Sequence, residues 1–505
     1  MARYVLVNRR AGLFTEEAKV ASRASLASTL TLLKKPKIEA DHEPKDPLAR
    51  RVVVLDADPN EVAALRPKLP PSAVLEPLVR RQLHRRRPQL MRNATPLHVK
   101  VMASAKAQYT VTITGSNKPL AGIEVLLYLS NAHGQTQNTT VNTDANGKAA
   151  IKLPSGYRLA MVEPIPFDSY WIMLAEAPAS GSTVDCIPIS KAPAGGNGWW
   201  HDVMGIDTSD AERGAGIKVG VIDTGCGPHP NLAHVNLVGV YVDGNALPGA
   251  QATDVAQHGT HTSGIIGARP HQPGDYAGIA AGCDLYHARV FKGEGPEDGP
   301  SQADIINAID ALSRDQGCDL INMSLGGGPA SQAEEDCIRD ALERGTLCIC
   351  SAGNEDGPID YPGAYPECCA VSAIGQLGWA PPGTFSNSNR PQDPSKLGAN
   401  NLFLAAFSCY AAPGQTLACA APGVGIVSTV PDRNGSTGRY MEMDGTSMAS
   451  PAACAALAVI LANEPTYAKL PRDNSRSTAA RNLLTQHCVS IGLSASYEGR
   501  GLPHV

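Results

Sequence analysis

The sequence places a serine where it could act as a nucleophile. Ser447 lies within DGTSMASP (residues 444–451), which runs directly into the small, apolar stretch 452–461. The turn residues before it and the helical pattern after it predict that Ser447 begins a buried helix, where unpaired N–H groups and the positive dipole end favour an anion. Pro451 falls within the first turn, where no intrahelical donor is needed. Attack by such a serine on a carbonyl requires a base nearby.

Two upstream segments supply a base and a carboxylate. The β-branched run 217–222 ends in Asp223 and a glycine turn. This pattern predicts a buried parallel strand with Asp223 at its C-terminal edge, where catalytic groups collect. His258 opens HGTHTSGIIG (258–267), which is predicted to be a second helix. The chain therefore carries in order the three groups that can activate a serine for acyl transfer.

These segments resemble those of the subtilisin family of serine endopeptidases, whose Asp-His-Ser order is the same. The stretch CSAGNE (350–355) is similar to the family's oxyanion segment, and INMSLGG (321–327) is similar to the strand that lines its substrate cleft. The resemblance covers roughly residues 199–487. It implies a subtilisin-like α/β fold, a parallel sheet with helices on both faces, and a serine endopeptidase.

The resemblance also implies roles for individual residues. Ser447 would attack the scissile carbonyl, His258 would accept and return its proton, and Asp223 would orient the imidazole. Asn354 and the backbone N–H of Ser447 would form the oxyanion hole. The residues expected to line the substrate cleft are Ser324, Leu325 and Gly326.

Two acidic residues bear on specificity. In the family pattern, Asp360 lies at the floor of the pocket for the side chain before the cut, and Glu355 lies near its mouth. A carboxylate there favours a substrate arginine or lysine, because charge-assisted pairing offsets the cost of desolvation. The alternative is that Asp360 caps an exposed loop, since charged residues are mostly exposed. The sequence leaves both readings open.

Metal ions are not expected to be required, nor is any other cofactor. Subtilases often bind calcium through an Asp after the His-Pro that follows the catalytic aspartate, and here that residue is Asn231. The loop 269–275 offers one carboxylate, Asp275, so this calcium site is expected to be weak or absent, while others stay open. His261 lacks the H-E-x-x-H arrangement of a zinc site and is predicted to be a packed core residue.

Length and composition exclude several classes of protein. A chain of 505 residues predicts about two to four domains. The net charge of −5 and the absence of aromatics within the arginine run 80–92 argue against nucleic acid, and no apolar run approaches the ~20 residues that span a bilayer. The 13 cysteines fit a reducing compartment. The first ten residues lack the apolar core of a secretory signal, so we expect a cytoplasmic protein, with leaderless export left open.

Residues 1–92 are predicted to form a small α+β (ferredoxin-like) domain. Its expected elements are strands at 4–8, 51–55 and 72–79 and helices at 15–33 and 60–68. In position and pattern the domain resembles the subtilase propeptide, an intramolecular inhibitor and chaperone. A catalytic domain built from non-local parallel strand pairings is expected to fold slowly, which gives a physical reason for an N-terminal domain that assists its folding. The run 80–92, with six arginines, lies where self-cleavage is expected, although a solvated linker is the alternative.

Two further domains follow. Residues 95–190 contain short β-rich runs separated by glycine and asparagine turns, which predict a small antiparallel β-sandwich similar to accessory modules of other enzymes. Residues 196–505 would be the subtilisin-like catalytic domain. Its segment 388–415 is longer than the family usually has, and we expect a surface insertion that rims the cleft or an inert loop.

The leading hypothesis is a zymogen protease that cuts protein or peptide substrates and is autoprocessed near residues 80–92. One alternative is a non-catalytic scaffold that binds a partner while its own N-terminal domain occupies the cleft. A subtilisin-like transpeptidase is another, because acyl transfer to an amine uses the same three residues and differs in how solvent is excluded.

Overall fold

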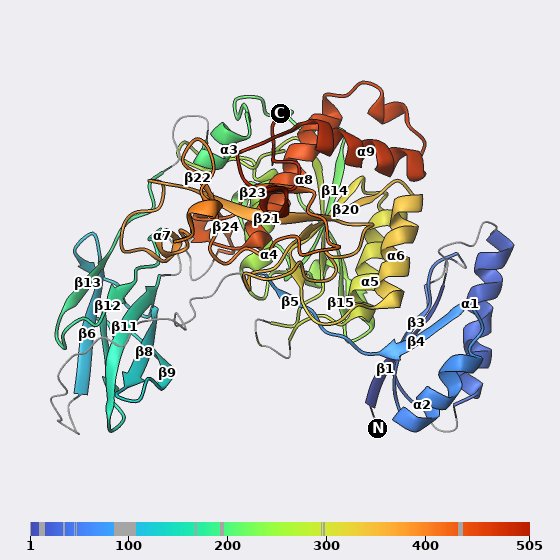
Figure 1. Cartoon of the computed structure of the whole chain (residues 1–505), viewed down its shortest axis with the longest axis horizontal. Coiled ribbons are helices and arrows are strands. Elements are labelled where there is room, and N and C mark those ends of the chain that lie inside the picture. Colours follow the sequence, from blue (N-terminus) through green and yellow to red (C-terminus); the bar gives the residue numbers. More distant parts are fainter. Residues whose placement is uncertain are drawn as a thin grey trace.

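The computed structural model describes residues 2–9, 16–33, 36–44, 46, 48–84, 108–166, 169–191, 196–293, 295, 298–432 and 438–505. Figure 1 shows an N-terminal domain and a β-sandwich on opposite sides of a larger C-terminal domain. Residues 85–92 of the arginine run and residues 95–107 of the expected β-sandwich lie outside the described residues.

The described part of the N-terminal domain forms a four-stranded sheet with two α-helices. Its elements are β1 (Ala2–Asn8), α1 (Glu16–Thr31), β2 (Lys37–His42), β3 (Val52–Ala57), α2 (Pro59–Leu65) and β4 (Ala73–Pro77). The strand order is β2-β3-β1-β4 and each neighbouring pair is antiparallel, which is the ferredoxin-like arrangement. The sequence pattern did not indicate β2. Helix α2 begins at Pro59, not at Asn60, because the Asp58 carboxylate caps it by accepting from the N–H groups of Asn60 and Glu61.

Within the described residues, the β-sandwich consists of two four-stranded sheets. Its strands are β6 (Gln108–Gly115), β7 (Lys118–Pro119), β8 (Glu124–Asn131), β9 (Thr136–Asn142), β10 (Lys148–Lys152), β11 (Tyr157–Ile165), β12 (Ala175–Glu176) and β13 (Thr183–Cys186). All described pairs are antiparallel except β13 with β6. Strand β13 arrives beside β6 from the other sheet, so no hairpin fixes its direction. The predicted small antiparallel β-sandwich is confirmed, with this one parallel pair among its strands.

The C-terminal domain is built around a nine-stranded sheet in the described part of the chain, with the path β16-β15-β17-β14-β18-β20-β21-β22 and β23 beside β21. Strands β16 and β22 are antiparallel to their neighbours, and the other pairs are parallel. The sheet strands are β14 (Lys218–Asp223), β15 (Asn236–Val242), β16 (Asn245–Pro248), β17 (Asp284–Arg289), β18 (Leu320–Met323), β20 (Leu347–Ser351), β21 (Cys369–Gln376), β22 (Leu402–Leu404) and β23 (Cys419–Pro422).

Helices and short strand pairs complete this domain. The helices are α3 (Trp199–Val203), α4 (His258–Gly267), α5 (Gln302–Asp310), α6 (Gln332–Glu343), α7 (Phe385–Ser388), α8 (Thr446–Ala462), α9 (Asn474–Gln486) and α10 (Ala495–Glu498). The remaining strands are β5 (Gln82–Leu83), which pairs with β19 (Leu325–Gly326), β24 (Ile426–Val430), which pairs with β25 (Arg439–Met443), and β26 (Cys488–Val489), which pairs with β27 (Leu502–Pro503).

Helices cover both faces of the large sheet, as the sequence predicts. Val219 and Val221 of β14 belong to a buried cluster that includes Met448 of α8, whereas Ile222 belongs to a second cluster with Ile305 of α5. Successive residues of a strand point to opposite faces, so α8 and α5 lie on opposite sides of β14. This places the C-terminal edge of a central parallel strand between two helical layers.

The N-terminal sheet uses the same alternation to join the C-terminal domain. Tyr4 and Leu6 of β1 pack in the domain's own cluster with Leu26 of α1. Val5 and Val7 instead belong to the cluster that contains α5 and α6. One face of this small sheet is thus covered by its own helices and the other by helices of the C-terminal domain (Figure 1).

The segment 388–415 is not a surface insertion throughout. Strand β22 pairs with β21, and its three residues are buried in the main core. Phe407 and Cys409 are also buried. The prediction of a surface insertion rested on the turn-rich residues 391–399. The apolar run that follows them instead adds an edge strand to the sheet.

The described residues contain neither a disulfide bond nor a helix that could span a membrane. All 13 cysteines lie within the described residues, none forms a disulfide, and all but Cys488 are buried. Among the described residues, no helix has both the length and the apolar character that crossing a bilayer demands.

Candidate active site

Asp223 and His258 meet at the C-terminal edge of the large sheet. Asp223 ends β14 and His258 begins α4. The imidazole Nδ1 lies 2.7 Å from Asp223 Oδ1, and both side chains are fully buried. Thr262 Oγ1 donates to the other carboxylate oxygen at 3.1 Å, and the Thr224 N–H donates to Oδ1 at 2.7 Å. The carboxylate is therefore fixed, and donation from Nδ1 leaves the Nε2 lone pair as an acceptor.

Ser447 lies in the first turn of α8, which packs against α4. Its hydroxyl donates to the carbonyl of Ser324 at 3.0 Å, and Ser324 Oγ donates to the carbonyl of Ser447 at 2.8 Å. His258 Nε2 is buried and makes no hydrogen bond to any described residue. The serine hydroxyl is thus turned from the imidazole toward Ser324. Rotation about its χ1 bond redirects the hydroxyl, and such hydrogen bonds are often unformed before substrate is in place.

Asn354 and Ser447 share one acceptor, the main-chain carbonyl of His84. Asn354 Nδ2 donates to this oxygen, and the Ser447 N–H donates to it at 3.4 Å. The opposite side of the amide is fixed because Asn354 Oδ1 accepts from the N–H and the hydroxyl of Thr446, each at 3.0 Å. Two N–H donors that converge on one carbonyl form the arrangement that stabilises an oxyanion.

The segment 80–84 lies across the C-terminal domain as an extended strand. Strand β5 runs antiparallel to β19, with Leu83 opposite Leu325 and Gln82 opposite Gly326. On its other side, the Arg81 N–H donates to the carbonyl of Pro300 at 2.9 Å. Figure 1 shows β5 reaching from the N-terminal domain to the centre of the molecule. The main chain before His84 is therefore held between strand β19 and the segment at residues 300–301, as an extended peptide substrate would be.

The imidazole of His84 occupies a site formed by Gly326, Ser351 and Asp360, which we call the His84 site. Nδ1 lies 2.7 Å from Ser351 Oγ, and Nε2 lies 3.2 Å from Asp360 Oδ2. A Cβ atom on Gly326 would lie 2.3 Å from His84 Cε1, so only glycine leaves room for the ring. The Asp360 side chain is 30% exposed, which places it in contact with both the ring and solvent.

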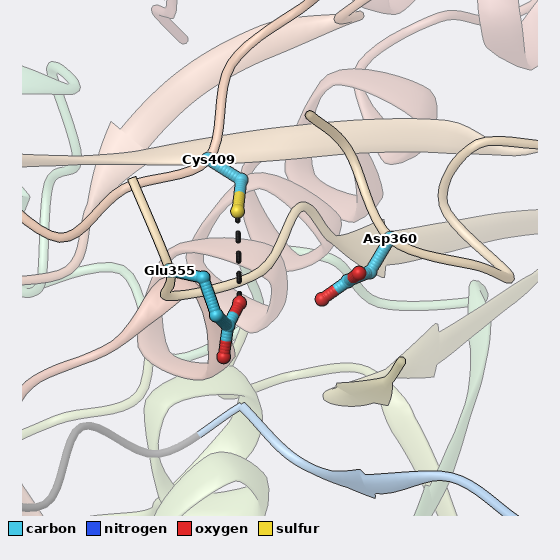
Figure 2. A group of neighbouring side chains, drawn as sticks. All are labelled: Glu355, Asp360 and Cys409. Atoms are coloured by element: carbon cyan, nitrogen blue, oxygen red, sulfur yellow. Dashed lines mark hydrogen bonds between the residues drawn. The ribbon is translucent and has the colours of Figure 1, made fainter. Parts of the chain in front are cut away.

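Glu355, Asp360 and Cys409 converge beside this site, and Figure 2 shows them directed toward one another. Their oxygen and sulfur atoms lie within 4.8 Å of one another. Glu355 Oε2 accepts from the Asn354 N–H at 2.7 Å and from Cys409 Sγ at 3.7 Å. Burial raises the pKa of Cys409 to about 12, so this thiol keeps its proton at neutral pH. The charge of the group comes from its two carboxylates.

The residues at the position of the expected weak calcium site are hydrogen-bonded to one another. Asn231 presents its amide nitrogen, which donates to Asp275 Oδ2 at 3.1 Å and to the Tyr440 hydroxyl at 2.7 Å. The same oxygen of Asp275 accepts from the N–H groups of His271 and Gln272 at 2.9 Å. Calcium requires several oxygen ligands, and here the one carboxylate already accepts from three N–H groups.

The structure gathers most of the residues singled out from the sequence, with two differences of position. Leu325 and Gly326 contact segment 82–84, but Ser324 lies behind Ser447 and bonds to that residue. Glu355 lies beside Asp360, where its carboxylate accepts from the backbone next to it. His261 is a fully buried residue whose Nε2 bonds to the carbonyls of two other strands, at positions 426 and 441.

Four residues of the candidate active site were not predicted from the sequence. Ser351 lies in the segment 350–355 and Thr446 in the segment 444–451, next to residues with predicted roles, so their adjacency in sequence was the available signal. Cys409 comes from the segment expected to be an inert or rim loop. His84 lies in the arginine run, and its place depends on a strand pairing between residues over two hundred positions apart.

Comparison with known proteins matches the part of the chain that contains the candidate active site. A sequence model of the Subtilase family matches residues 214–489. The chain is 32% identical over 299 residues to subtilisin DY of Bacillus licheniformis, covering 58% of this chain and 90% of that protein. It is 33% identical over 261 residues to the major intracellular serine protease of Bacillus subtilis (strain 168), covering 50% of this chain and 70% of that protein. Asp223, His258, Asn354 and Ser447 fall within the matched range.

Proposed function

The chain belongs to the subtilase family and is a serine endopeptidase, and on that premise we propose that Ser447, His258 and Asp223 are its catalytic residues. The observation that carries the proposal is the carbonyl of His84, which lies between the N–H donors of Asn354 and Ser447. That carbonyl stands where the carbonyl of a scissile peptide bond would be attacked.

In the proposed reaction, the Ser447 hydroxyl rotates from Ser324 toward His258 Nε2 and attacks the carbonyl carbon. His258 accepts the proton and returns it to the leaving amine. Asp223 orients the imidazole, and Thr262 holds the Asp223 carboxylate in place. The acyl-enzyme is then hydrolysed by water through the same groups. The negative oxygen of each tetrahedral intermediate is stabilised by Asn354 Nδ2. Loss of one such donor lowers kcat by ~100- to 1,000-fold in subtilisin, the enzyme on which that value was measured.

We further propose that the chain cleaves itself after His84 and that residues 1–84 then remain as an inhibitor in the cleft. The extended pairing of β5 with β19 supports this position for the cut. The docked face of the N-terminal sheet supports the inhibitory role, because it buries Val5 and Val7 against the C-terminal domain. A zymogen of this kind stays inactive until the N-terminal domain is removed.

The proposed substrates are proteins or peptides with a basic residue before the cut. Asp360 gives the His84 site one carboxylate and Glu355 places a second beside it, and the present occupant of the site is itself a basic side chain. An arginine or lysine in that position would form a charge-assisted pair with Asp360. Asp360 is partly exposed, so the expected preference is moderate.

Catalysis by these residues needs no metal or other cofactor, and the proposed location is intracellular. The reducing interior of a cell suits a chain with 13 free cysteines. One similar protein is named as an intracellular serine protease, which is compatible with this location.

A fluorophosphonate probe tests the proposal directly. We expect the probe to label the purified protein at Ser447 after its N-terminal domain has been removed, and not to label the Ser447→Ala variant. Labelling and peptide hydrolysis should be equal with and without EDTA. A protein that is folded, free of its N-terminal domain and still not labelled would contradict the proposed function.

A further inference from the structure

Arg81, three residues before His84, is the most completely enclosed charged side chain of segment 80–84. Its side chain and that of Glu334 are both 0% exposed. Arg81 Nη2 and Nε donate to the two carboxylate oxygens of Glu334. Nη1 donates to the carbonyls of Gly327 and Pro329. We call these three acceptor residues the Arg81 site.

The Arg81 site belongs to the C-terminal domain and is held there independently of Arg81. Glu334 lies in the first turn of α6, where its N–H donates to Ser331 Oγ at 3.2 Å. The Tyr365 hydroxyl donates to Glu334 Oε2 at 3.1 Å and lies 2.9 Å from the carbonyl of Ser331. These contacts with Ser331 and Tyr365 lie within the C-terminal domain, so they can keep the Glu334 carboxylate close to the positive end of the helix when residues 1–84 leave.

The geometry fits a guanidinium better than other side chains. The carboxylate accepts from two nitrogens of the planar fork, and the carbonyls accept from the third. Burial opposes the charged form of Arg81, but the charge of Glu334 and its hydrogen bond outweigh this effect and raise the pKa of Arg81. Lysine offers a single ammonium and cannot match this pattern, and leucine would leave the Glu334 carboxylate buried and unpaired.

The register places this site in the path of a substrate. His84 provides the carbonyl at Asn354, so Arg81 is the fourth residue before the bond to be cleaved. The Arg81 N–H bonds to Pro300, and the neighbouring residues 82 and 83 pair with β19. Any peptide bound in the same strand pairing carries its fourth side chain into the Arg81 site.

We propose that Glu334 is a specificity-determining residue, which makes this protease select substrates with arginine at the fourth position before the cut. The inference rests on the proposed function of the active site. The Arg81 site would then be a second cation site of the cleft, more strongly desolvated than the acidic His84 site. Substrates would then carry a pattern of two basic residues separated by two others.

Peptides that copy residues 79–86 test the inference, with arginine, lysine or leucine at position 81 and all else unchanged. Each peptide is incubated with protein that was produced as the full-length chain and then freed of its N-terminal domain. The values of kcat/KM are compared within one preparation. A ratio between peptides is insensitive to partial misfolding, because inactive molecules lower all rates equally. We expect the arginine peptide to be favoured over the leucine peptide on the order of 100-fold, with lysine between them.

Two variants complete the test. Glu334→Gln should lower hydrolysis of the arginine peptide on the order of 100-fold and leave the leucine peptide within about threefold, which removes the discrimination. Glu335→Gln is the matched control, because the neighbouring Glu335 pairs with Arg339 on the helix surface, and it should keep the wild-type ratio.

The outcomes separate this inference from the proposed function. Equal hydrolysis of the arginine and leucine peptides by the wild-type protein would overturn the role of Glu334 and leave the proposed protease intact. Discrimination that persists in Glu334→Gln would also overturn it. Absence of hydrolysis of every peptide, together with no fluorophosphonate labelling of Ser447, would overturn the proposed function and this inference with it.

Discussion

The guanidinium of Arg50 lies 3.0 Å from the carboxylate of Asp340, and each side chain is only 1% exposed. Arg50 belongs to the N-terminal domain and Asp340 to α6, so this ion pair is buried at the junction of two domains. Arg50 also donates to Asp310 and to the carbonyl of Asp336, both at 3.0 Å. A charge this deeply buried is tolerated because each of its partners is in place.

Replacement of Arg50 should loosen the N-terminal domain. In the Ser447→Ala chain, which cannot cut itself in this account, Arg50→Met should lower the free energy of opening of β1 and β3 by about 3 kcal/mol. Arg344 also contacts Asp310 and Asp340, so these carboxylates keep one cationic partner in the variant. The expected loss of free energy is therefore at the lower end of the range for a broken buried ion pair. Amide hydrogen exchange measures this quantity.

Arg51→Met serves as the control for that prediction. Arg51 pairs with Asp41 at the surface of the same domain, and such pairs contribute about 1 kcal/mol or less. Equal exchange rates in the two variants would show that the Arg50 ion pair does not hold the domains together.

Gly326→Ala should obstruct the His84 site. The new Cβ would lie 2.3 Å from the ring of His84, and the carbonyl of Tyr361 lies 2.7 Å away on the other side. Crowding of this kind costs about 1–3 kcal/mol, so kcat/KM for a peptide with histidine or arginine before the cut should fall by about 5- to 150-fold. A peptide with glycine in that position should be affected less.

Gly357→Ala is the matched control for Gly326→Ala, because a Cβ there would meet its nearest neighbour at 3.9 Å. If Gly326→Ala cleaves the histidine and glycine peptides with the wild-type ratio, the ring of the substrate does not lie over Gly326.

Asp360→Asn tests the preference for a basic residue before the cut. The substitution keeps the volume of the side chain and removes its charge, so kcat/KM for an arginine peptide should fall about tenfold while a leucine peptide changes little. Asp356→Asn is a suitable control, since Asp356 pairs with Lys396 on the neighbouring loop. An unchanged ratio of arginine to leucine hydrolysis in Asp360→Asn would remove Asp360 from the account of specificity.

Stability should fall in mild acid partly because His287 is buried in the neutral form. Its Nε2 accepts from the Gly225 N–H at 3.1 Å, and Nδ1 lies 3.0 Å from Ser263 Oγ. Burial lowers the pKa of His287 from 6.5 to about 4. Between these values the unfolded chain binds a proton that the folded chain does not, so the free energy of unfolding falls as the pH falls from 6.5 toward 4.

His287→Gln should remove this part of the pH dependence. Between pH 7 and pH 5, the loss of unfolding free energy in the Ser447→Ala background should be smaller by about 2 kcal/mol than with histidine in place. Urea unfolding at the two pH values measures the loss, and the exposed His133 provides a His→Gln control. Identical pH dependence with and without His287 would mean that this histidine is charged in the folded protein.

The parts of the site that depend on local sequence could be predicted, and those that depend on distant pairing could not. Ser447 lies in the first turn of a helix and His258 begins one, each within a short segment whose composition indicates a buried helix start, and Asp223 ends a strand that its β-branched run identifies. The α/β sheet follows from the same patterns. His84 and Arg81 carry no local signal, because their positions depend on the pairing of β5 with β19.

Burial of charge is a second feature that the sequence does not show. Glu334 and Asp340 lie on a helix with many charged residues, which suggests an exposed face, yet each receives an arginine from the N-terminal part of the chain. The partners are more than 250 residues apart in sequence. Composition alone shows neither the pairing nor the depth at which it occurs.

The N-terminal residues of the purified protein give the most direct test of the central claim, that Ser447 cleaves the bond after His84. Mass spectrometry of the wild-type full-length protein should find a new N-terminus at residue 85, and the Ser447→Ala protein should remain uncut there. A wild-type chain that stays intact, or the same new N-terminus in the Ser447→Ala protein, would contradict the account.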